Sequence, residues 1–280
     1  MRVKEKAFAK LNLTLEIGEK RADGYHDLRS VMTCCDLYDT LTVEKAEGIS
    51  MTCDDERLAC DGSNLCVRAA EVFFADTKIH GGAAILLQKV IPMQAGLGGG
   101  SADAAAVLRA LRRLYAPDLS DGELERMAEK LGSDVPFCVK SRTALCEGRG
   151  ERLTPLRKLP KLWYVIVKPE ESFATGPMYS ALDESVGSRE RTTDAMLHAV
   201  EKSDKKEIYK NIHNDFHLAL PADSTVPEIL AKLSGMHAKA AAMSGSGSAV
   251  FGIYDNAYKA GVAAMLLQEQ GYKVFCAKSV

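Results

Sequence analysis

The chain has 280 residues, and its 36 lysines and arginines nearly balance 38 aspartates and glutamates, so the formal charge is −2. This balance gives no electrostatic reason to expect nucleic acid as a partner, because nucleic-acid binding favours a clustered basic surface. Hydrophobic residues make up 46% of the sequence and charged residues 26%, which excludes disorder, collagen-like repeats and coiled coil as overall classes. The length fits one large domain or two closely associated ones.

Eight cysteines are spread along the chain without the spacing of a metal knuckle or the density of a small secreted scaffold. We interpret them as reduced thiols. No secretory apolar region follows the start, and no apolar run approaches the roughly 18 residues that a membrane helix requires. The sequence therefore predicts a soluble, cytoplasmic protein without a membrane partner.

Predicted strands are spread over the whole chain. Apolar and polar residues alternate from Leu11 to Ile17, which predicts a strand with one buried face. Lys10 is expected at the beginning of this strand, projecting with Asn12 away from the leucines. Apolar stretches rich in β-branched or aromatic residues predict further strands at residues 40–44, 83–91, 162–167, 249–254 and 272–276.

The clearest predicted helix runs from Ser101 to Tyr115, where apolar residues recur at helical spacing. Ser101 is the expected N-cap, and Asp103 falls in the first turn. Further helices are predicted at residues 121–130, 226–233 and 257–270, and a linker or exposed helical segment at residues 184–206. Strands and helices mixed without strict alternation predict an α+β fold, and Pro155 and Pro160 indicate a boundary that would divide the chain almost evenly.

A glycine-rich segment between the predicted strand 83–91 and this helix is the strongest local signal. Its residues are Pro92, Met93, Gln94, Ala95, Gly96, Leu97, Gly98, Gly99, Gly100, Ser101 and Ala102. Glycines allow backbone conformations that a Cβ would block, and the helix that follows offers unpaired N–H groups with a positive dipole end. A tight turn would need only one or two glycines, so the segment predicts a phosphate cradle. It matches neither the P-loop nor the dinucleotide-binding pattern, and protein-kinase signatures are absent.

Three further features are ambiguous by themselves. The small residues of segment 243–249 fit either a turn or a close approach, to a phosphorylated ligand or to the first glycine-rich segment. Asp134 lies between a helix end and an expected strand entry at Pro136, where a lone aspartate is most often a cap. Lys10, by itself, is more typical of a solvated surface lysine.

Taken together, five segments resemble the GHMP small-molecule kinases, in the right order and across nearly the whole chain. They are residues 9–13, 21–26, 92–106, 132–136 and 243–251. The first two, Ala-Lys-Leu-Asn-Leu and Arg-Ala-Asp-Gly-Tyr-His, further resemble the branch that phosphorylates the 2-hydroxyl of a cytidylyl methylerythritol in non-mevalonate isoprenoid synthesis. The resemblance implies a ribosomal-protein-S5-like N-terminal lobe, expected at residues 1–155, and a ferredoxin-like C-terminal lobe at 156–280, with the active site between them.

The resemblance also implies roles for single residues, with ATP and Mg²⁺ as cofactors. Asp134 matches the catalytic aspartate, a base that orients the substrate alcohol and takes its proton, and Lys10 matches the catalytic lysine, which would keep that carboxylate ionised. The implied ATP contacts are Asn64 and residues 92–102. The implied substrate contacts are Asn12, Tyr25, His26 and Thr175, with Tyr25 stacking on the cytosine and His26 reading its edge.

The chain departs from the family pattern at Ala174 and Ala102, where many members have serine, which affects fine contacts rather than the reaction. Two alternatives stay open. One is another GHMP kinase, acting on homoserine, mevalonate or a sugar, which would not need a base reader at Tyr25 and His26. The other is a nucleotide-binding regulator without turnover, which would not need Lys10 and Asp134 together. The sequence predicts neither the Mg²⁺ ligands nor the oligomeric state.

Overall fold

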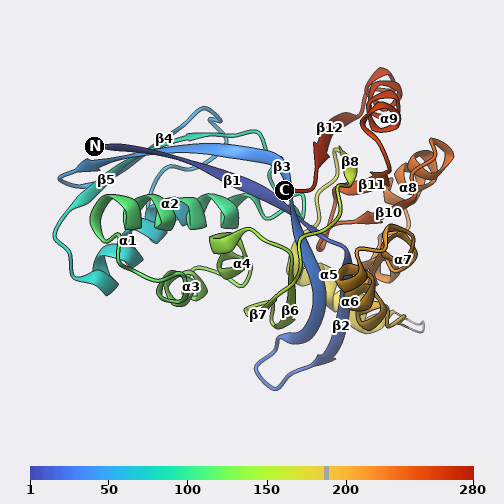
Figure 1. Cartoon of the computed structure of the whole chain (residues 1–280), viewed down its shortest axis with the longest axis horizontal. Coiled ribbons are helices and arrows are strands. Elements are labelled where there is room, and N and C mark those ends of the chain that lie inside the picture. Colours follow the sequence, from blue (N-terminus) through green and yellow to red (C-terminus); the bar gives the residue numbers. More distant parts are fainter. Residues whose placement is uncertain (186–188) are drawn as a thin grey trace. The chain divides into compact units, whose positions relative to one another are not determined.

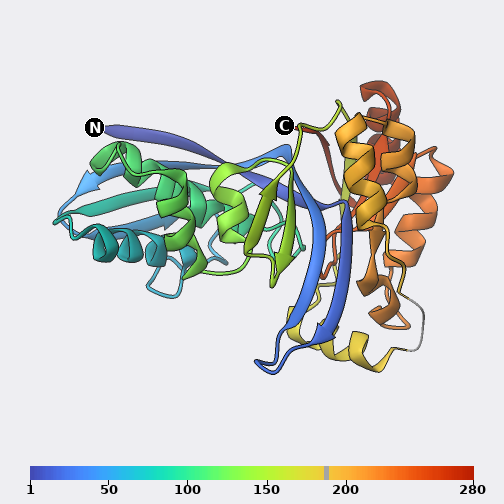
Figure 2. The same ribbon diagram turned by 60° about the horizontal axis from the view of Figure 1, so that its bottom comes forward.

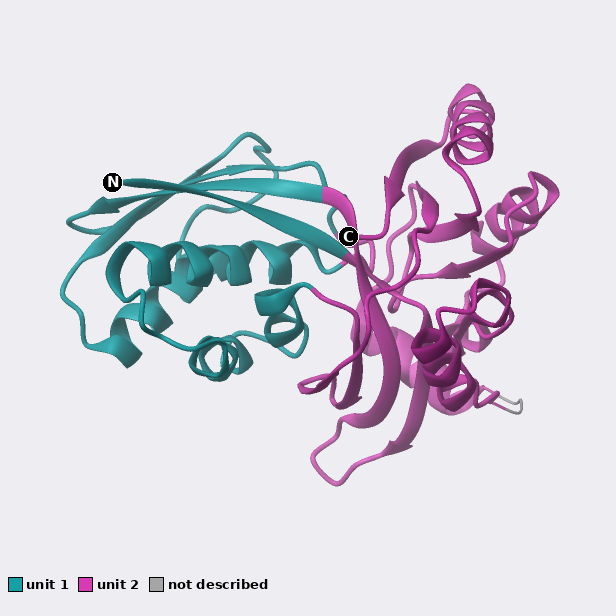
Figure 3. Cartoon of the chain, in the orientation of Figure 1, with its two compact units in different colours: residues 1–9, 38–93, 98–141 teal, residues 10–37, 94–97, 142–280 magenta. Residues whose placement is uncertain are grey.

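The computed structural model describes residues 1–185 and 189–280 (Figure 1). The chain forms two compact units (Figure 3). Unit 1 comprises residues 1–9, 38–93 and 98–141, and unit 2 comprises residues 10–37, 94–97 and 142–280. Two long strands, β1 (Arg2–Asn12) and β3 (His26–Ala46), each contribute residues to both units. The expected single division at residue 155 is a different partition and stays a prediction.

Unit 1 combines a sheet with four helices. β3 pairs antiparallel with β5 (Gly82–Gln88), which pairs in parallel with β4 (Ile49–Cys53). Helices α1 (Leu65–Thr77) and α2 (Gly99–Tyr115) pack against each other and against these strands. The shorter helices α3 (Asp121–Glu129) and α4 (Val135–Lys140) pack on α2. Figures 1 and 2 show the four helices grouped beside the strands.

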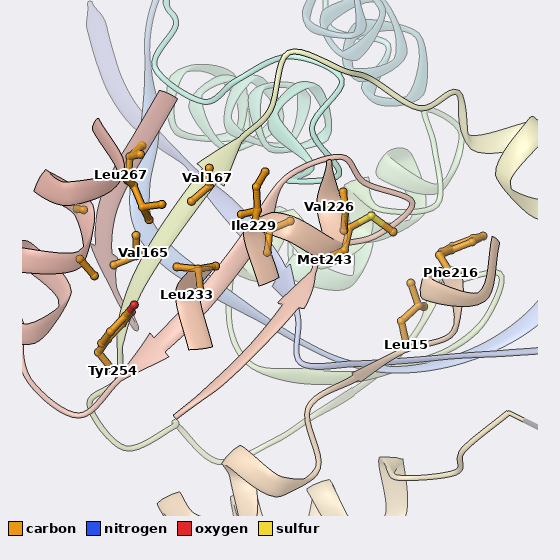
Figure 4. Close-up of a cluster of buried hydrophobic side chains, with 14 of the residues drawn as sticks. Leu15, Val165, Val167, Phe216, Val226, Ile229, Leu233, Met243, Tyr254 and Leu267 are labelled. Atoms are coloured by element: carbon orange, nitrogen blue, oxygen red, sulfur yellow. The ribbon is translucent and has the colours of Figure 1, made fainter. Parts of the chain in front are cut away.

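Unit 2 contains a four-stranded antiparallel sheet. Its strand order is β10 (Ala240–Met243), β11 (Val250–Tyr254), β8 (Trp163–Lys168) and β12 (Lys273–Lys278). Helices α8 (Val226–Gly235) and α9 (Ala257–Glu269) pack against it. Figure 4 shows the core that results, in which Val165 and Val167 of β8 lie near Ile229 and Leu233 of α8. This apolar burial fixes the ends of β10 and β11, from which one of the glycine-rich segments extends.

Unit 2 also contains shorter strands and helices outside this sheet. These are β2 (Thr14–Lys20), β6 (Ala144–Gly148), β7 (Arg152–Pro155), α5 (Thr175–Glu184), α6 (Thr193–Lys202), α7 (Lys205–Lys210), β9 (His213–Asn214) and the 3₁₀ helix Asp215–Ala219. β2 and β6 pair with β3, and β9 pairs in parallel with β2. Of the segment 184–206, residues 186–188 lie outside the described part. Its helical alternative is confirmed by α6 and α7, although α6 buries Thr193, Met196 and Val200 rather than lying fully exposed.

The predicted α+β class is confirmed, and most predicted strands and helices occur within a few residues of their expected bounds. The prediction of one strand from Leu11 to Ile17 is wrong, because β1 ends at Asn12 and β2 begins at Thr14. Lys10 accordingly lies near the end of a strand, not at its beginning. The expected polar face is buried as well: Asn12, Thr14 and Glu16 are at most 3% exposed. Alternation alone could not show this, since both faces are covered.

Two local predictions in unit 1 are also wrong. Helix α2 begins at Gly99, not Ser101, because its N-cap is Gly98, whose φ of 67° favours glycine over serine. The Pro136 segment opens helix α4 rather than a strand, and proline suits a first helical turn because the N–H that it lacks would be unpaired there. Among the described residues, no helix is both long enough and apolar enough to cross a bilayer.

Candidate functional site

In unit 2, Lys10 begins a buried chain of polar side chains. Its ammonium donates to Asn12 Oδ1 at 2.7 Å, and Asn12 Nδ2 donates to Ser30 Oγ at 2.8 Å. Ser30 in turn donates to the carbonyl of Thr14. Lys10 is only 4% exposed, so the solvated surface lysine that an isolated strand lysine suggests is excluded. A buried lysine requires oxygen partners, and this chain fixes where its ammonium lies.

The part of the first glycine-rich segment that belongs to unit 2, residues 94–97, is fixed through its carbonyl groups. The carbonyl of Ala95 accepts from the N–H of Ala249, and that of Leu97 accepts from the N–H of Lys10. φ is positive at Gln94 and Gly96, and again at Gly98, while the residues between them are not in the left-handed region. Such alternation is typical of backbone nests, in which successive N–H groups converge on an anion.

The second glycine-rich segment, residues 243–249, contacts the first. Ser244 Oγ donates to the carbonyl of Gly96 at 3.0 Å. A Cβ on Gly96 would lie 2.0 Å from the carbonyl oxygen of Ser244, so only glycine fits this approach. Lys10 Nζ lies 3.0 Å from where a Cβ of Gly245 would stand. The lysine and the two segments therefore form one cluster. Segment 243–249 makes the close approach to the first glycine-rich segment that the sequence left open.

Two polar side chains form hydrogen bonds with segment 243–249. Asn214 Nδ2 donates to the carbonyls of Met243 and Gly245 at 2.7 and 2.9 Å. Thr175, at the first position of α5, forms a hydroxyl hydrogen bond of 3.1 Å with Ser246. Thr175 thus contacts segment 243–249, and its expected substrate role stays a prediction, whereas Asn214 was not singled out from the sequence.

In unit 1, the start of α2 presents Gly99, Gly100, Ser101 and Ala102 after the Gly98 cap. No side chain caps this end, and the first N–H groups of an α-helix lack partners within the helix. Such an end attracts anions through these groups and the helix dipole. The geometry supports the predicted phosphate cradle while assigning its cap to Gly98.

A buried charge network lies beside this helix end. Lys89 Nζ donates to Asp39 at 2.5 Å and to Asp103 at 2.9 Å, and all three side chains are at most 7% exposed. Asp39 Oδ1 also accepts from the N–H groups of Val90 and Ile91, directly before the glycine-rich segment. The network therefore ties that segment's entry to β3 and α2. The prediction that Asp103 lies in the first helical turn is wrong, because α2 begins at Gly99, and Asp103 is buried in this network.

The network is electrostatically unbalanced, with two carboxylates on one ammonium. Burial and the carboxylate of Asp39 raise the pKa of Asp103 to about 8, against the opposing effect of Lys89. Asp103 Oδ1 has no hydrogen-bond partner among the described residues. Burial works against the charge of Lys89, but Asp103 and Asp39 outweigh it and raise the pKa of the ammonium. The buried carboxyl of Asp103 therefore keeps its proton to a higher pH than an exposed aspartate does.

Two other predicted site residues belong to unit 1. Asn64 is the N-cap of α1, where its side chain accepts from the N–H of Cys66 and donates to the carbonyl of Ala59. Asp134 occupies the N-cap position of α4 without a side-chain cap hydrogen bond. The Asp134 side chain therefore does not make the hydrogen bond that defines a helix N-cap, whereas the Asn64 side chain does.

Tyr25 and His26 lie at the turn between β2 and β3, where Gly24 has a φ of 85°. Tyr25 is 54% exposed, and the guanidinium of Arg149 lies 5.0 Å from the centroid of its ring. His26 is buried, and its Nε2 lies 2.8 Å from Asp183. An exposed ring beside a buried, oriented imidazole can stack on a base and present a fixed hydrogen-bonding atom.

Comparison with known proteins identifies the family. The description "GHMP kinases N terminal domain" matches residues 64–142, and "GHMP kinases C terminal" matches residues 196–273. A 4-diphosphocytidyl-2-C-methyl-D-erythritol kinase of Caldicellulosiruptor saccharolyticus is 42% identical over 261 residues, covering 91% of this chain and 89% of that protein. The chain belongs to the 4-diphosphocytidyl-2-C-methyl-D-erythritol kinase family. The resemblance drawn from the five segments is thereby confirmed.

Solved structures agree with membership of the 4-diphosphocytidyl-2-C-methyl-D-erythritol kinase family. A crystal structure titled 4-(cytidine 5'-diphospho)-2C-methyl-D-erythritol kinase is 33% identical, has a TM-score of 0.83 and covers 99% of each chain. A homoserine kinase from Cytophaga hutchinsonii has a TM-score of 0.74 at 16% identity, over 100% of this chain and 94% of that one. This second likeness shows a shared fold alone.

Proposed function

We propose that this chain transfers the γ-phosphoryl group of ATP to the 2-hydroxyl of 4-diphosphocytidyl-2-C-methyl-D-erythritol, a step of non-mevalonate isoprenoid precursor synthesis. The observation that carries the proposal is the buried Lys10 ammonium held between Asn12 and the two glycine-rich segments. A fixed cation beside backbone N–H groups that can converge on phosphate suits phosphoryl transfer, because that reaction depends mainly on positioning and electrostatics. Family membership supplies the substrate.

Asp134 and Lys10 carry the chemical step in this proposal. The substrate hydroxyl is that of a tertiary alcohol, a poor nucleophile, and the Asp134 carboxylate orients it and accepts its proton as the oxygen–phosphorus bond forms. The ammonium of Lys10 offsets negative charge on the transferring group. Asn12 holds that ammonium in place through its 2.7 Å hydrogen bond and is itself a proposed substrate contact.

ATP and Mg²⁺ are the proposed cofactors. Residues 92–102 and Asn64 are the proposed ATP contacts, and the alternating backbone of 94–98 is typical of nests whose N–H groups bind an anion such as phosphate. Mg²⁺ prefers phosphate and water oxygens with one or two carboxylates. No group of three or more histidines, cysteines or carboxylates suited to a metal occurs in residues 1–185 and 189–280. The ion would neutralise phosphate charge.

The proposed substrate contacts are Asn12, Tyr25, His26 and Thr175. The exposed ring of Tyr25 offers a stacking surface, and His26 offers one imidazole edge to the base. We also propose the lobe division at residues 1–155 and 156–280. The cytoplasmic location stays a prediction from the sequence.

The test is transfer of a labelled phosphoryl group. The protein is incubated with Mg²⁺, ATP labelled at the γ-phosphate and 4-diphosphocytidyl-2-C-methyl-D-erythritol, and the labelled product is examined by phosphorus NMR. The proposal expects label on the 2-oxygen of the methylerythritol. Label on another oxygen would contradict the assigned reaction, and ATP binding without transfer would favour the nucleotide-binding regulator.

A further inference from the structure

The imidazole of His26 has a carboxylate partner that the proposed function does not use. Its Nε2 lies 2.8 Å from Oδ1 of Asp183, and the His26 side chain is 4% exposed. The ring also stacks on Tyr179, with centroids 4.9 Å apart and planes at 15°. Tyr179 and Asp183 are four residues apart on α5, so they occupy successive turns of one helix face. One helix therefore fixes both the plane and one edge of the histidine ring.

Helix α5 is itself held firmly. Met178 and Leu182 are buried in the hydrophobic core of unit 2. The ring of Tyr179 packs edge-on against Phe216, with centroids 5.0 Å apart. Arg189 donates to the carbonyl of Leu182 at 3.2 Å, near the end of the helix. The core therefore holds the backbone of α5 from which the partly exposed Asp183 side chain extends to His26.

The hydrogen shared by His26 and Asp183 belongs to the imidazole, because an ionised carboxylate only accepts. The ammonium of Lys20 lies 3.8 Å from the other oxygen of this carboxylate, Asp183 Oδ2. A neutral ring with hydrogen on Nε2 has a lone pair on Nδ1. Nδ1 has no hydrogen-bond partner within the described residues, so this lone pair is available to a ligand.

An acceptor at Nδ1 distinguishes the two pyrimidine bases. Cytosine presents the N4 amino group, a donor, at the position where uracil presents the acceptor O4. The Nδ1 lone pair can accept from N4, whereas it would face the lone pairs of O4. Leaving a buried polar pair unsatisfied in this way weakens binding substantially.

We propose that Asp183 is a specificity-determining positioning residue, which fixes the tautomer of His26 so that the enzyme accepts a cytosine nucleotide and rejects its uracil analogue. This inference rests on the proposed function, in which His26 reads the base. Asp183 acts through His26 and does not itself contact the substrate.

The test compares Asp183→Asn with the wild type on the cytidylyl substrate and its uridylyl analogue. An amide can donate to Nε2 and move the ring hydrogen to Nδ1. We expect KM for the cytidylyl compound to rise about tenfold or more with a smaller change in kcat, and the cytidylyl preference in kcat/KM to fall by a similar factor. Glu184→Gln removes the same charge one residue away and should leave both values unchanged. Equal loss on both substrates, or no loss, would overturn the proposal.

Nitrogen-15 NMR of the histidine rings provides a readout independent of turnover. The wild type should show His26 with hydrogen on Nε2 and none on Nδ1, and Asp183→Asn should change this pattern while Glu184→Gln does not. Hydrogen on Nδ1 in the wild type would overturn the proposal even in an active enzyme. Failure of the proposed function has a different signature: the wild type would phosphorylate neither compound, whatever its tautomer, and the specificity role would fall with it.

Discussion

At the scale of single residues, the charged side chains form two kinds of ion pair, buried and solvent-exposed. Lys89 lies between the buried carboxylates of Asp39 and Asp103, whereas Lys130 forms an exposed pair with Asp76. Removing one partner of a buried ion pair leaves a charge without compensation in a medium that solvates it poorly. Exposed pairs contribute little, because water and salt screen them.

Lys89→Met should therefore destabilise the protein by about 3–5 kcal/mol, since it strands two buried carboxylates. The matched variant Lys130→Met should cost less than about 1 kcal/mol. Urea unfolding followed by circular dichroism measures both. Equal losses in the two variants would show that the network is not the structural anchor described here.

Asp134→Asn tests the proposed base directly. The amide keeps the shape of the side chain but accepts no proton, so kcat should fall by a factor of about 10²–10⁴. ATP affinity, measured by calorimetry, should stay within about twofold, because the change removes an interaction of the transition state and leaves the contacts that bind ATP intact. Asp118→Asn, at an exposed position, serves as the control. Turnover retained in Asp134→Asn would remove this residue from the base role.

At the scale of elements, the sequence predicted what depends on local patterning. The strands of the four-stranded sheet and the helix ending at Tyr115 follow from apolar periodicity, and the glycine-rich segment was found from its composition. The Lys89–Asp39 and His26–Asp183 pairs join residues 50 and 157 positions apart. Such contacts depend on strand register and helix packing, which no local pattern contains. Without the family resemblance, Tyr25 and His26 would also have gone unnoticed.

Gly96→Ala tests the close approach of the two glycine-rich segments. A Cβ there would meet the carbonyl oxygen of Ser244 at 2.0 Å, and a φ of 72° strains any other residue. We expect a stability loss of about 1–3 kcal/mol and weaker ATP binding. Gly122→Ala, in α3, meets nothing within 4 Å and should be neutral or stabilise by up to about 1 kcal/mol. Two variants of equal stability would contradict the described approach.

At the scale of the whole molecule, a buried histidine should shape the acid stability. Burial, with a smaller effect of His213, lowers the pKa of His217 from 6.5 to about 4, and its Nε2 accepts from the N–H of Met243 at 3.0 Å. The unfolded chain binds a proton at this residue below pH 6.5 and the folded chain does not. His217 therefore supports the fold above pH 6.5, and this support is lost as the pH falls toward 4.

His217→Gln should flatten the acid side of the stability profile, since glutamine can accept the same hydrogen bond without titrating. The wild type should lose up to about 1.4 kcal/mol per pH unit more than the variant between pH 6.5 and 4. Urea unfolding at several pH values measures the difference. Parallel profiles for the two proteins would show that His217 is not kept neutral by the fold.

ADP release shows whether this kinase acts on the cytidylyl methylerythritol. One preparation is assayed with Mg·ATP against 4-diphosphocytidyl-2-C-methyl-D-erythritol, homoserine, mevalonate and galactose. We predict turnover with the cytidylyl compound alone, and near-complete loss of that turnover in His26→Ala. Turnover with one of the other three acceptors, or silence on all four with ATP binding intact, would contradict the account.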